Sequence, residues 1–152
     1  MKIILFKVIS GGQTGIDELG LSLAKLHGIS TGGFMPPGFM TEEGPKPEFK
    51  ELYDLEELDS GMWSKRTRYN VKSSDGTVIF GNIASKGTAS TINFLNKFKK
   101  PYCINPNGIE MIEFVISNQI GILNIAGNKE SILSMEYRNL ARESLITLFK
   151  QL

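Results

Sequence analysis

Two short loops hold the residues of this sequence whose types and spacing could do chemistry. The first, residues 10–17, reads SGGQTGID and follows an apolar run. Its three glycines within five positions let the backbone turn sharply and approach a ligand, with peptide N–H groups near the positive end of a following helix. The spacing is neither G-x-G-x-x-G nor G-x-x-x-x-G-K-[ST]. The loop therefore predicts an anion site and no particular reaction, with a plain tight turn as the alternative.

Side chains in this first loop strengthen the anion hypothesis. Gln13 and Thr14 can hydrogen-bond phosphate or hydroxyl oxygens. Asp17 can cap the helix, hold a ribose hydroxyl or repel an anion, and the spacing does not choose among these roles. The candidate binding residues in this loop are Gly11, Gly12, Gln13, Thr14, Gly15 and Asp17.

The second loop, residues 81–88, reads GNIASKGT and also follows an apolar run. Ser85, Gly87 and Thr88 are its candidate binding residues, and an ordinary loop with a helix N-cap is the alternative. A third small loop covers residues 127–131. All three follow predicted strands, so they should gather at one edge of a parallel sheet, where the first two should form a cradle for phosphate.

Other candidates stand alone in the sequence. Arg66 lies in a basic group that is either a solvated face or turned toward an acidic ligand. Trp63, the only tryptophan, could stack on a planar heterocycle, although burial is the commoner fate. Asp17 and Asp75 are weak candidates for a general base, and a turn role is the default for Asp75.

The order of apolar and helical patterns predicts the fold. Strands are expected at residues 3–9, 29–34, 76–80, 102–104 and 121–126, and helices at 16–26, 65–71, 88–95, 111–116 and 133–148. Residues 35–61 show no secure element and are either a lid or a surface excursion. The alternation predicts an α/β fold, a doubly wound Rossmann-like parallel sheet of about five or more strands with helices on both faces.

Composition limits the partners. The chain has 152 residues and a net charge of +1, which fits one domain over 1–152 and gives no electrostatic reason to expect nucleic acid or membrane as partner. One cysteine and one histidine, Cys103 and His27, argue against a disulfide, a structural metal site or a Ser-His-Asp set. No run is long enough for a membrane span, so we expect a cytoplasmic protein.

Several motifs in order along the chain resemble the molybdenum cofactor carrier family. They lie at residues 10–17, 33–38, 43–44, 66–67, 70–71, 74–77, 87–89, 126–127 and 131. This family is similar to a Rossmann-like group that includes the cytokinin-activating phosphoribohydrolases and the DNA-processing protein fold. The resemblance implies a homo-oligomer whose glycine loops bind the phosphate of molybdopterin or of a nucleotide, and it adds Arg66 and Asn70 to the site.

The sequence departs from that family at several positions. Glu18 stands where a basic residue is common, Lys86 where a second glycine is common, and Met35 where cysteine is frequent, so thiol ligation of molybdenum is not expected there. No glutamate closely follows Gly87 and Thr88, unlike in the phosphoribohydrolases. These features favour a carrier or sensor for a phosphorylated planar ligand, with molybdenum cofactor as cargo, over a nucleotide-hydrolysing enzyme or a purely structural module.

Overall fold

The computed structural model describes residues 2–61 and 63–152 and contains a six-stranded parallel sheet. The strands are β1 (Lys7–Ile9), β2 (Ser30–Met35), β5 (Leu55–Glu57), β6 (Gly76–Phe80), β7 (Tyr102–Ile104) and β8 (Ile122–Gly127). Their spatial order is β5-β2-β1-β8-β6-β7. Strand β8 lies between β1 and β6, and the chain runs outward from β1 to β5 on one side of it and from β6 to β7 on the other. This arrangement confirms the predicted doubly wound α/β fold.

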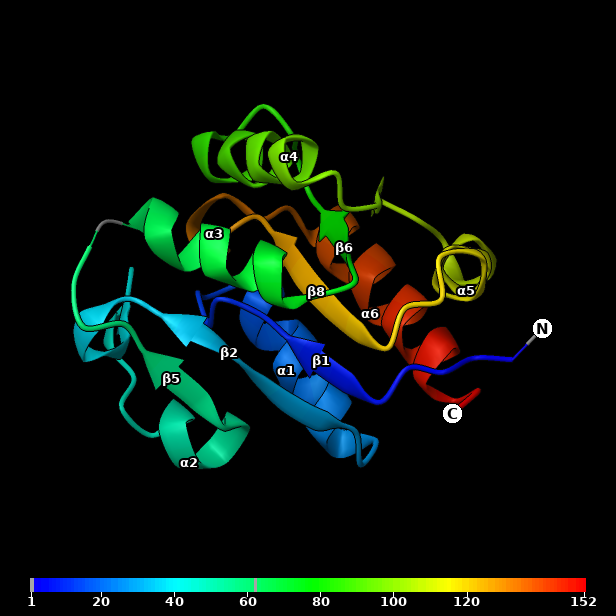
Figure 1. Ribbon diagram of the computed structural model, residues 1–152, viewed down its shortest axis with the longest axis horizontal. Helices are drawn as coiled ribbons and strands as arrows, with labels where there is room; N and C mark the ends of the chain where they lie inside the picture. The colour runs from blue at the N-terminus through cyan, green and yellow to red at the C-terminus, as the bar shows by residue number, and fades with distance from the viewer. Residues whose placement is uncertain (1, 62) are drawn as a thin grey trace.

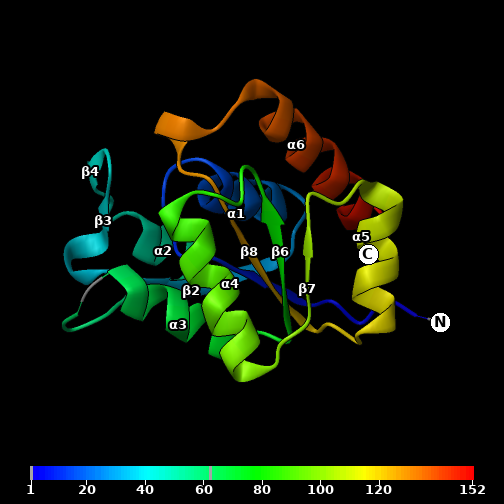
Figure 2. The same ribbon diagram turned by 90° about the horizontal axis from the view of Figure 1, so that it is seen from above.

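Helices cover both faces of the sheet (Figures 1 and 2). On one face lie α1 (Ile16–Leu26), α5 (Gly108–Ser117) and α6 (Met135–Phe149), and on the other lie α3 (Trp63–Ser73) and α4 (Lys86–Phe98). Because α1 follows β1 and α4 follows β6 on opposite faces, a crevice is expected between these helices at the carboxyl end of β8.

The central strands are buried as their sequences predict. All five residues of β6 are buried, as expected for a strand that helices cover on both sides. The larger apolar cluster packs α1, α5 and α6 against the sheet and includes Val8, Phe80 and Leu145. A smaller cluster of Val71, Ile79 and Leu95 packs α3 and α4 against the opposite face.

The segment 35–61 contains more structure than the sequence predicts. It holds a 3₁₀ turn (Pro37–Phe39), a small hairpin of β3 (Met40–Thr41) and β4 (Gly44–Pro45), the short helix α2 (Phe49–Tyr53), and β5, which pairs in parallel with β2. Only the first residue of β5 is buried, because this strand lies at the sheet edge. Such a strand lacks the apolar run that reveals a central strand.

The first strand is shorter than predicted. The apolar pattern suggested residues 3–9, but only Lys7–Ile9 pair with neighbouring strands. Phe6 is 61% exposed, so the apolar residues just before β1 are not all buried.

Asp75 closes the amino end of the sheet. Its Oδ2 accepts hydrogen bonds from the backbone N–H of Gly121 at 3.0 Å and of Ile122 at 2.8 Å, where β8 begins. The turn role expected by default for Asp75 is the one that these contacts serve.

Replacing Asp75 with alanine should destabilise the protein, because two backbone N–H groups lose their acceptor. We expect the free energy of unfolding to fall by about 1–2 kcal/mol, measured by denaturant unfolding. The matched control is Asp59→Ala, since the Asp59 side chain is 94% exposed. Equal stability of the two variants would contradict this role.

Candidate functional site

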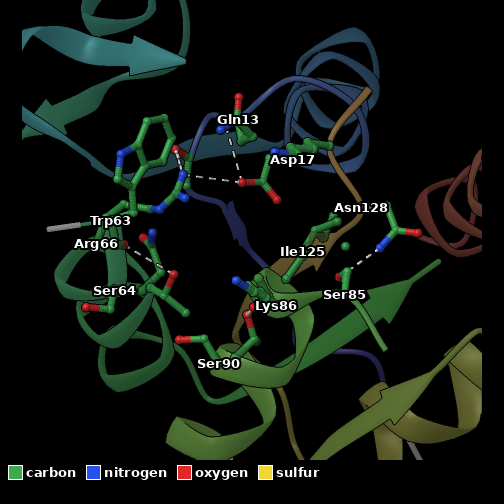
Figure 3. Close-up of a pocket in the computed structure, with 18 of the residues that line it drawn as sticks. Gln13, Asp17, Trp63, Ser64, Arg66, Ser85, Lys86, Ser90, Ile125 and Asn128 are labelled. Atoms are coloured by element: carbon green, nitrogen blue, oxygen red, sulfur yellow. Dashed lines mark hydrogen bonds and ion pairs between the residues drawn. The ribbon is translucent and has the colours of Figure 1, made fainter. Parts of the chain in front are cut away.

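A cavity of about 680 Å³ opens at the carboxyl ends of the central strands, between α3, α4 and the first glycine loop (Figure 3). Its walls include Gln13 and Asp17 from that loop and the start of α1, Trp63 and Arg66 from α3, Lys86 and Gly87 from α4, and Asn124 and Ile125 from β8. The structure thus brings parts of the first and second loops together at one edge, as the sequence predicted, and it adds Arg66, which the sequence left open between a solvated face and a ligand contact.

Arg66 is the buried cation of this cavity. Its side chain is 12% exposed, and Nη1 donates to the carbonyl oxygen of Gly11 at 2.8 Å and lies 3.8 Å from Oδ2 of Asp17. The guanidinium also lies over the Trp63 ring, 5.4 Å from its centre. Its buried Nε has no hydrogen-bond partner among the described residues. Burial lowers the pKa of Arg66, and the nearby Asp17 carboxylate opposes that effect.

Gly11 is a glycine because Arg66 needs the space. A Cβ at this position would collide with Cδ, Nε and Nη1 of Arg66. The requirement comes from close approach, since Gly11 is not among the glycines with positive φ. The first loop therefore positions the guanidinium.

Asp17 faces Arg66 from the first turn of α1. The residue is 9% exposed, and its Oδ2 accepts a hydrogen bond from the backbone N–H of Gln13 at 3.2 Å. Desolvation by burial raises the pKa of Asp17 to about 6, although Arg66 and backbone N–H groups act in the opposite direction. Its other carboxylate oxygen forms no hydrogen bond within the described chain, although the backbone N–H of Gly11 is near enough to lower the pKa of the carboxyl, and Figure 3 shows this oxygen directed away from Gln13 and Arg66.

Several donors of the first loop are already used by the protein, while the N–H groups of Gly11 and Gly15 have no acceptor among the described residues. The N–H of Gly12 donates to Ser10 Oγ at 3.2 Å, and the N–H of Thr14 donates to Gln13 Oε1 at 2.9 Å. The Thr14 hydroxyl donates to Glu42 and accepts from the N–H of Glu130. The cavity lining of the described chain does not include Gly12, Thr14 or Gly15, so ligand contacts by these three residues stay predictions.

The second loop presents free donors to the cavity. Ser85 caps α4 by accepting from the N–H of Thr88, while the buried Thr88 hydroxyl accepts from Ser85 and lies outside the lining. Among the described residues, the N–H groups of Lys86 and Gly87 donate to no acceptor. A Cβ at Gly87 would meet nothing within 4 Å. The amino end of α4 is therefore open to a ligand.

The structure gives the other candidates different surroundings. Asn70 lines the cavity, but its amide both accepts from and donates to the backbone of Phe34, at 2.9 and 3.0 Å, which fixes α3 to β2. Asp75 lies at the opposite end of the sheet and cannot act with the cavity residues. Trp63 is 43% exposed in the cavity wall, as stacking on a ligand would require.

Sequence reasoning missed Glu42, Asn124 and Asn128. Glu42 lies beyond β3 and accepts hydrogen bonds from the Thr14 hydroxyl and from the N–H and hydroxyl of Ser131, which lower its pKa. The Asn128 amide donates to Ser85 and to the carbonyl oxygen of Asn82, which joins the second and third loops. Asn124 stands inside an apolar strand, and that break in the pattern was the available signal.

Residues 2–61 and 63–152 contain no group of three or more His, Cys, Asp or Glu side chains placed to hold a metal ion. No helix in these ranges combines the length and the apolar character needed to cross a bilayer.

The fold and the cavity define a class of protein, a Rossmann-like α/β protein with a ligand-sized cavity at the carboxyl ends of its strands. The profile of the circularly permutated YpsA SLOG family matches residues 8–147. The chain belongs to this family.

Two individual proteins are similar to the chain. The crystal structure of a "Putative molybdenum carrier protein" from Syntrophus aciditrophicus SB superposes with a TM-score of 0.85 and 34% identity, over 98% of this chain and 97% of that one. Subunit 4 of the vacuolar transporter chaperone complex of Schizosaccharomyces pombe is 30% identical over 124 residues, which are 77% of this chain but only 16% of that protein. The first likeness confirms the resemblance to molybdenum carrier proteins in sequence and fold.

Replacing Asp17 with asparagine should stabilise the protein at neutral pH. The pKa of this carboxyl is raised from 3.8 to about 6 in the folded state. Between these values the folded state holds a proton that the unfolded state has released, so the Asp17 contribution to stability falls as pH rises. Above pH 6 the buried carboxylate is ionised and carries this penalty, which Asp17→Asn removes together with the ion pair to Arg66.

Denaturant unfolding at pH 4 and pH 7.5 measures this effect. The variant should be more stable than the original protein at pH 7.5, and the difference should shrink toward pH 4. Glu18→Gln is the matched control, because it removes a carboxylate one residue away that does not line the cavity. A stability difference that does not change with pH would contradict the raised pKa of Asp17.

Proposed function

We propose that the protein is a carrier or sensor that binds a phosphorylated planar ligand in the cavity between α3 and α4. The observation that carries this proposal is the meeting, in one cavity, of a buried and incompletely paired Arg66 with the open amino end of α4. The description of the Syntrophus protein makes molybdenum cofactor the first candidate for the cargo. A nucleotide shares the same features of phosphate and planar ring.

The phosphate would bind at the amino end of α4. The free N–H groups of Lys86 and Gly87 and the positive end of the helix dipole suit an anion. The Lys86 side chain, which also lines the cavity, adds positive charge at the same place. This narrows the predicted two-loop cradle, because the Gly12 and Thr14 donors of the first loop are engaged within the protein.

The planar part of the ligand would bind between apolar and aromatic groups. The Trp63 ring is half-exposed in the cavity wall, and the Arg66 guanidinium lies near the ring. The exposed part of the indole can stack on a planar heterocycle. Ile125 and Ile132 supply apolar surface in the same cavity. The volume of about 680 Å³ is in the range of small-molecule sites.

The residues present fit a pterin phosphate without a thiol from the protein. Cys103 is the single cysteine; it lies on β7, packs against the larger apolar cluster and is not part of the lining. Burial raises the pKa of its thiol to about 12, so it supplies no thiolate. The protein would therefore recognise the organic part and phosphate of the cargo.

A second candidate function is hydrolysis of an N-glycosidic or phosphoester bond in a nucleotide or an ADP-ribose-like substrate. One observation favours it: the Asp17 carboxyl has a pKa of about 6 and lies in the cavity wall, which suits a general base. Incubation with nucleoside monophosphates, ADP-ribose and NAD tests this function. Release of base or sugar phosphate that Asp17→Asn abolishes would establish it.

We further propose that the protein is a single domain, forms a homo-oligomer and resides in the cytoplasm. The family resemblance supports the oligomeric state, and the composition supports the compartment. Sedimentation analysis tests the oligomeric state.

Replacing Gly87 with leucine should block ligand binding, because the new side chain fills the space at the amino end of α4. The protein is produced in a host that makes molybdenum cofactor, and the bound pterin and molybdenum are measured by mass spectrometry and elemental analysis. We expect at least a tenfold loss of bound cofactor, which corresponds to about 1.4 kcal/mol.

The matched control is Ala89→Leu, which adds the same side chain on an exposed part of the same helix turn outside the cavity lining. The control should retain its cargo. Equal cargo in both variants would place the ligand elsewhere, and absence of any cargo or nucleotide binding in the unmodified protein would contradict the proposed function.

A further inference from the structure

The cavity has walls of opposite hydrogen-bonding character. The amino end of α4 offers free N–H donors and the Lys86 ammonium. From the first turn of α1, Asp17 offers an acceptor, because one of its oxygens bonds to the N–H of Gln13 and the other has no partner in the described chain. Figure 3 shows Asp17 and Lys86 extending from different elements into the same space.

The charged groups around Asp17 decide what it can accept. Arg66 on α3 lies 3.8 Å from the carboxylate, and Lys86 and Lys129 also line the cavity, while Glu42 adds a negative charge beyond β3. Arg66 and Asp17 together carry no net charge. A phosphate therefore gains most at α4, away from Asp17, and a neutral group that donates a hydrogen bond gains most at Asp17.

We propose that Asp17 determines specificity for the part of the ligand that is not phosphate, by accepting a hydrogen bond from a neutral O–H or N–H donor. Two sources supply such a donor, a sugar hydroxyl and an exocyclic amino group of the heterocycle. This inference rests on the proposed function, because it requires a ligand whose phosphate lies at the amino end of α4.

The Gln13 N–H makes the replacement Asp17→Asn unusually informative. That N–H requires an acceptor, so the amide oxygen of the variant would take the place of Oδ2 and the amide NH₂ group would point into the cavity. The substitution keeps the shape of the side chain and turns an acceptor into a donor. A ligand donor would then meet another donor.

Acidification should have the same effect in the original protein. Near pH 6 a proton would reside on the free oxygen of Asp17, since the other oxygen accepts from Gln13. The single histidine, His27, ends α1 at its opposite end and is outside the cavity lining. Dividing the affinity of the original protein by that of Asp17→Asn at each pH removes the titration of the phosphate itself.

The experiment measures binding of guanosine 5′-monophosphate by calorimetry at pH 7.5 and 5.5. This probe carries a phosphate, two sugar hydroxyls and the 2-amino-4-oxo edge that guanine shares with pterins. Inosine 5′-monophosphate lacks the amino group, and 2′,3′-dideoxyguanosine 5′-monophosphate lacks the hydroxyls. Glu18→Gln is the matched control, because its carboxylate neighbours Asp17 but does not line the cavity.

At pH 7.5 we expect Asp17→Asn to weaken binding of guanosine monophosphate by about 10–100-fold and Glu18→Gln to leave it unchanged. One of the two analogues should show the same loss in the original protein and no further loss in Asp17→Asn, and that analogue identifies the donor. The advantage of the original protein over the variant should shrink at pH 5.5. Thermal unfolding verifies that the variant is folded.

Unchanged or tighter binding by Asp17→Asn would overturn this inference while the proposed function stands, because it would show that Asp17 only repels the anion. Losses for both analogues that persist in the variant would also overturn it, by assigning Asp17 a purely structural effect. Failure of the original protein to bind any of the three probes would overturn this inference, and if the protein also retains no pterin cargo the proposed function falls with it.

Discussion

The burial of the Arg66 guanidinium is the interaction on which the site depends. A buried cation is costly unless other groups compensate its charge. Here the carbonyl oxygen of Gly11, the Asp17 carboxylate and the Trp63 ring compensate it in part, and Nε keeps no partner in the described chain. The first glycine loop, the start of α1 and the start of α3 are thereby held around one charge. This part of the cavity wall is therefore built around the Arg66 guanidinium.

The main elements of the fold could be predicted because the local pattern of apolar residues indicates which residues of each element are buried. The apolar run of β6 and the helical spacing of α1 gave both type and position. The edge strand β5 could not be predicted, since two of its three residues face solvent and its position depends on pairing with β2. The start of β1 was mispredicted for a similar reason. Strand pairing begins only at Lys7, and the apolar Phe6 before it is exposed, so the sequence pattern does not mark where the strand begins.

For the site, the sequence predicted which segments meet but not what each donor does there. The gathering of the two loops follows from the alternation of strands and helices, which places both loops at the carboxyl ends of parallel strands, whereas the position of Arg66 does not. The use of the Thr14 hydroxyl by Glu42 depends on a contact between residues 28 positions apart, and no local pattern encodes it. The same is true of Asn70, whose amide is committed to Phe34. The structure therefore commits the Thr14 hydroxyl and the Asn70 amide to contacts within the protein.

In the proposed function, a phosphorylated ligand with a planar ring binds in the cavity beside Trp63. Because Trp63 is the single tryptophan of the chain, its fluorescence reports on that binding. The direct measurement is the emission of Trp63 during titration with guanosine 5′-monophosphate, excited where guanine absorbs little. We expect saturable quenching of the Trp63 emission, which excess inorganic phosphate reverses by competing for the amino end of α4. Saturable binding by calorimetry with no change in Trp63 emission would contradict it.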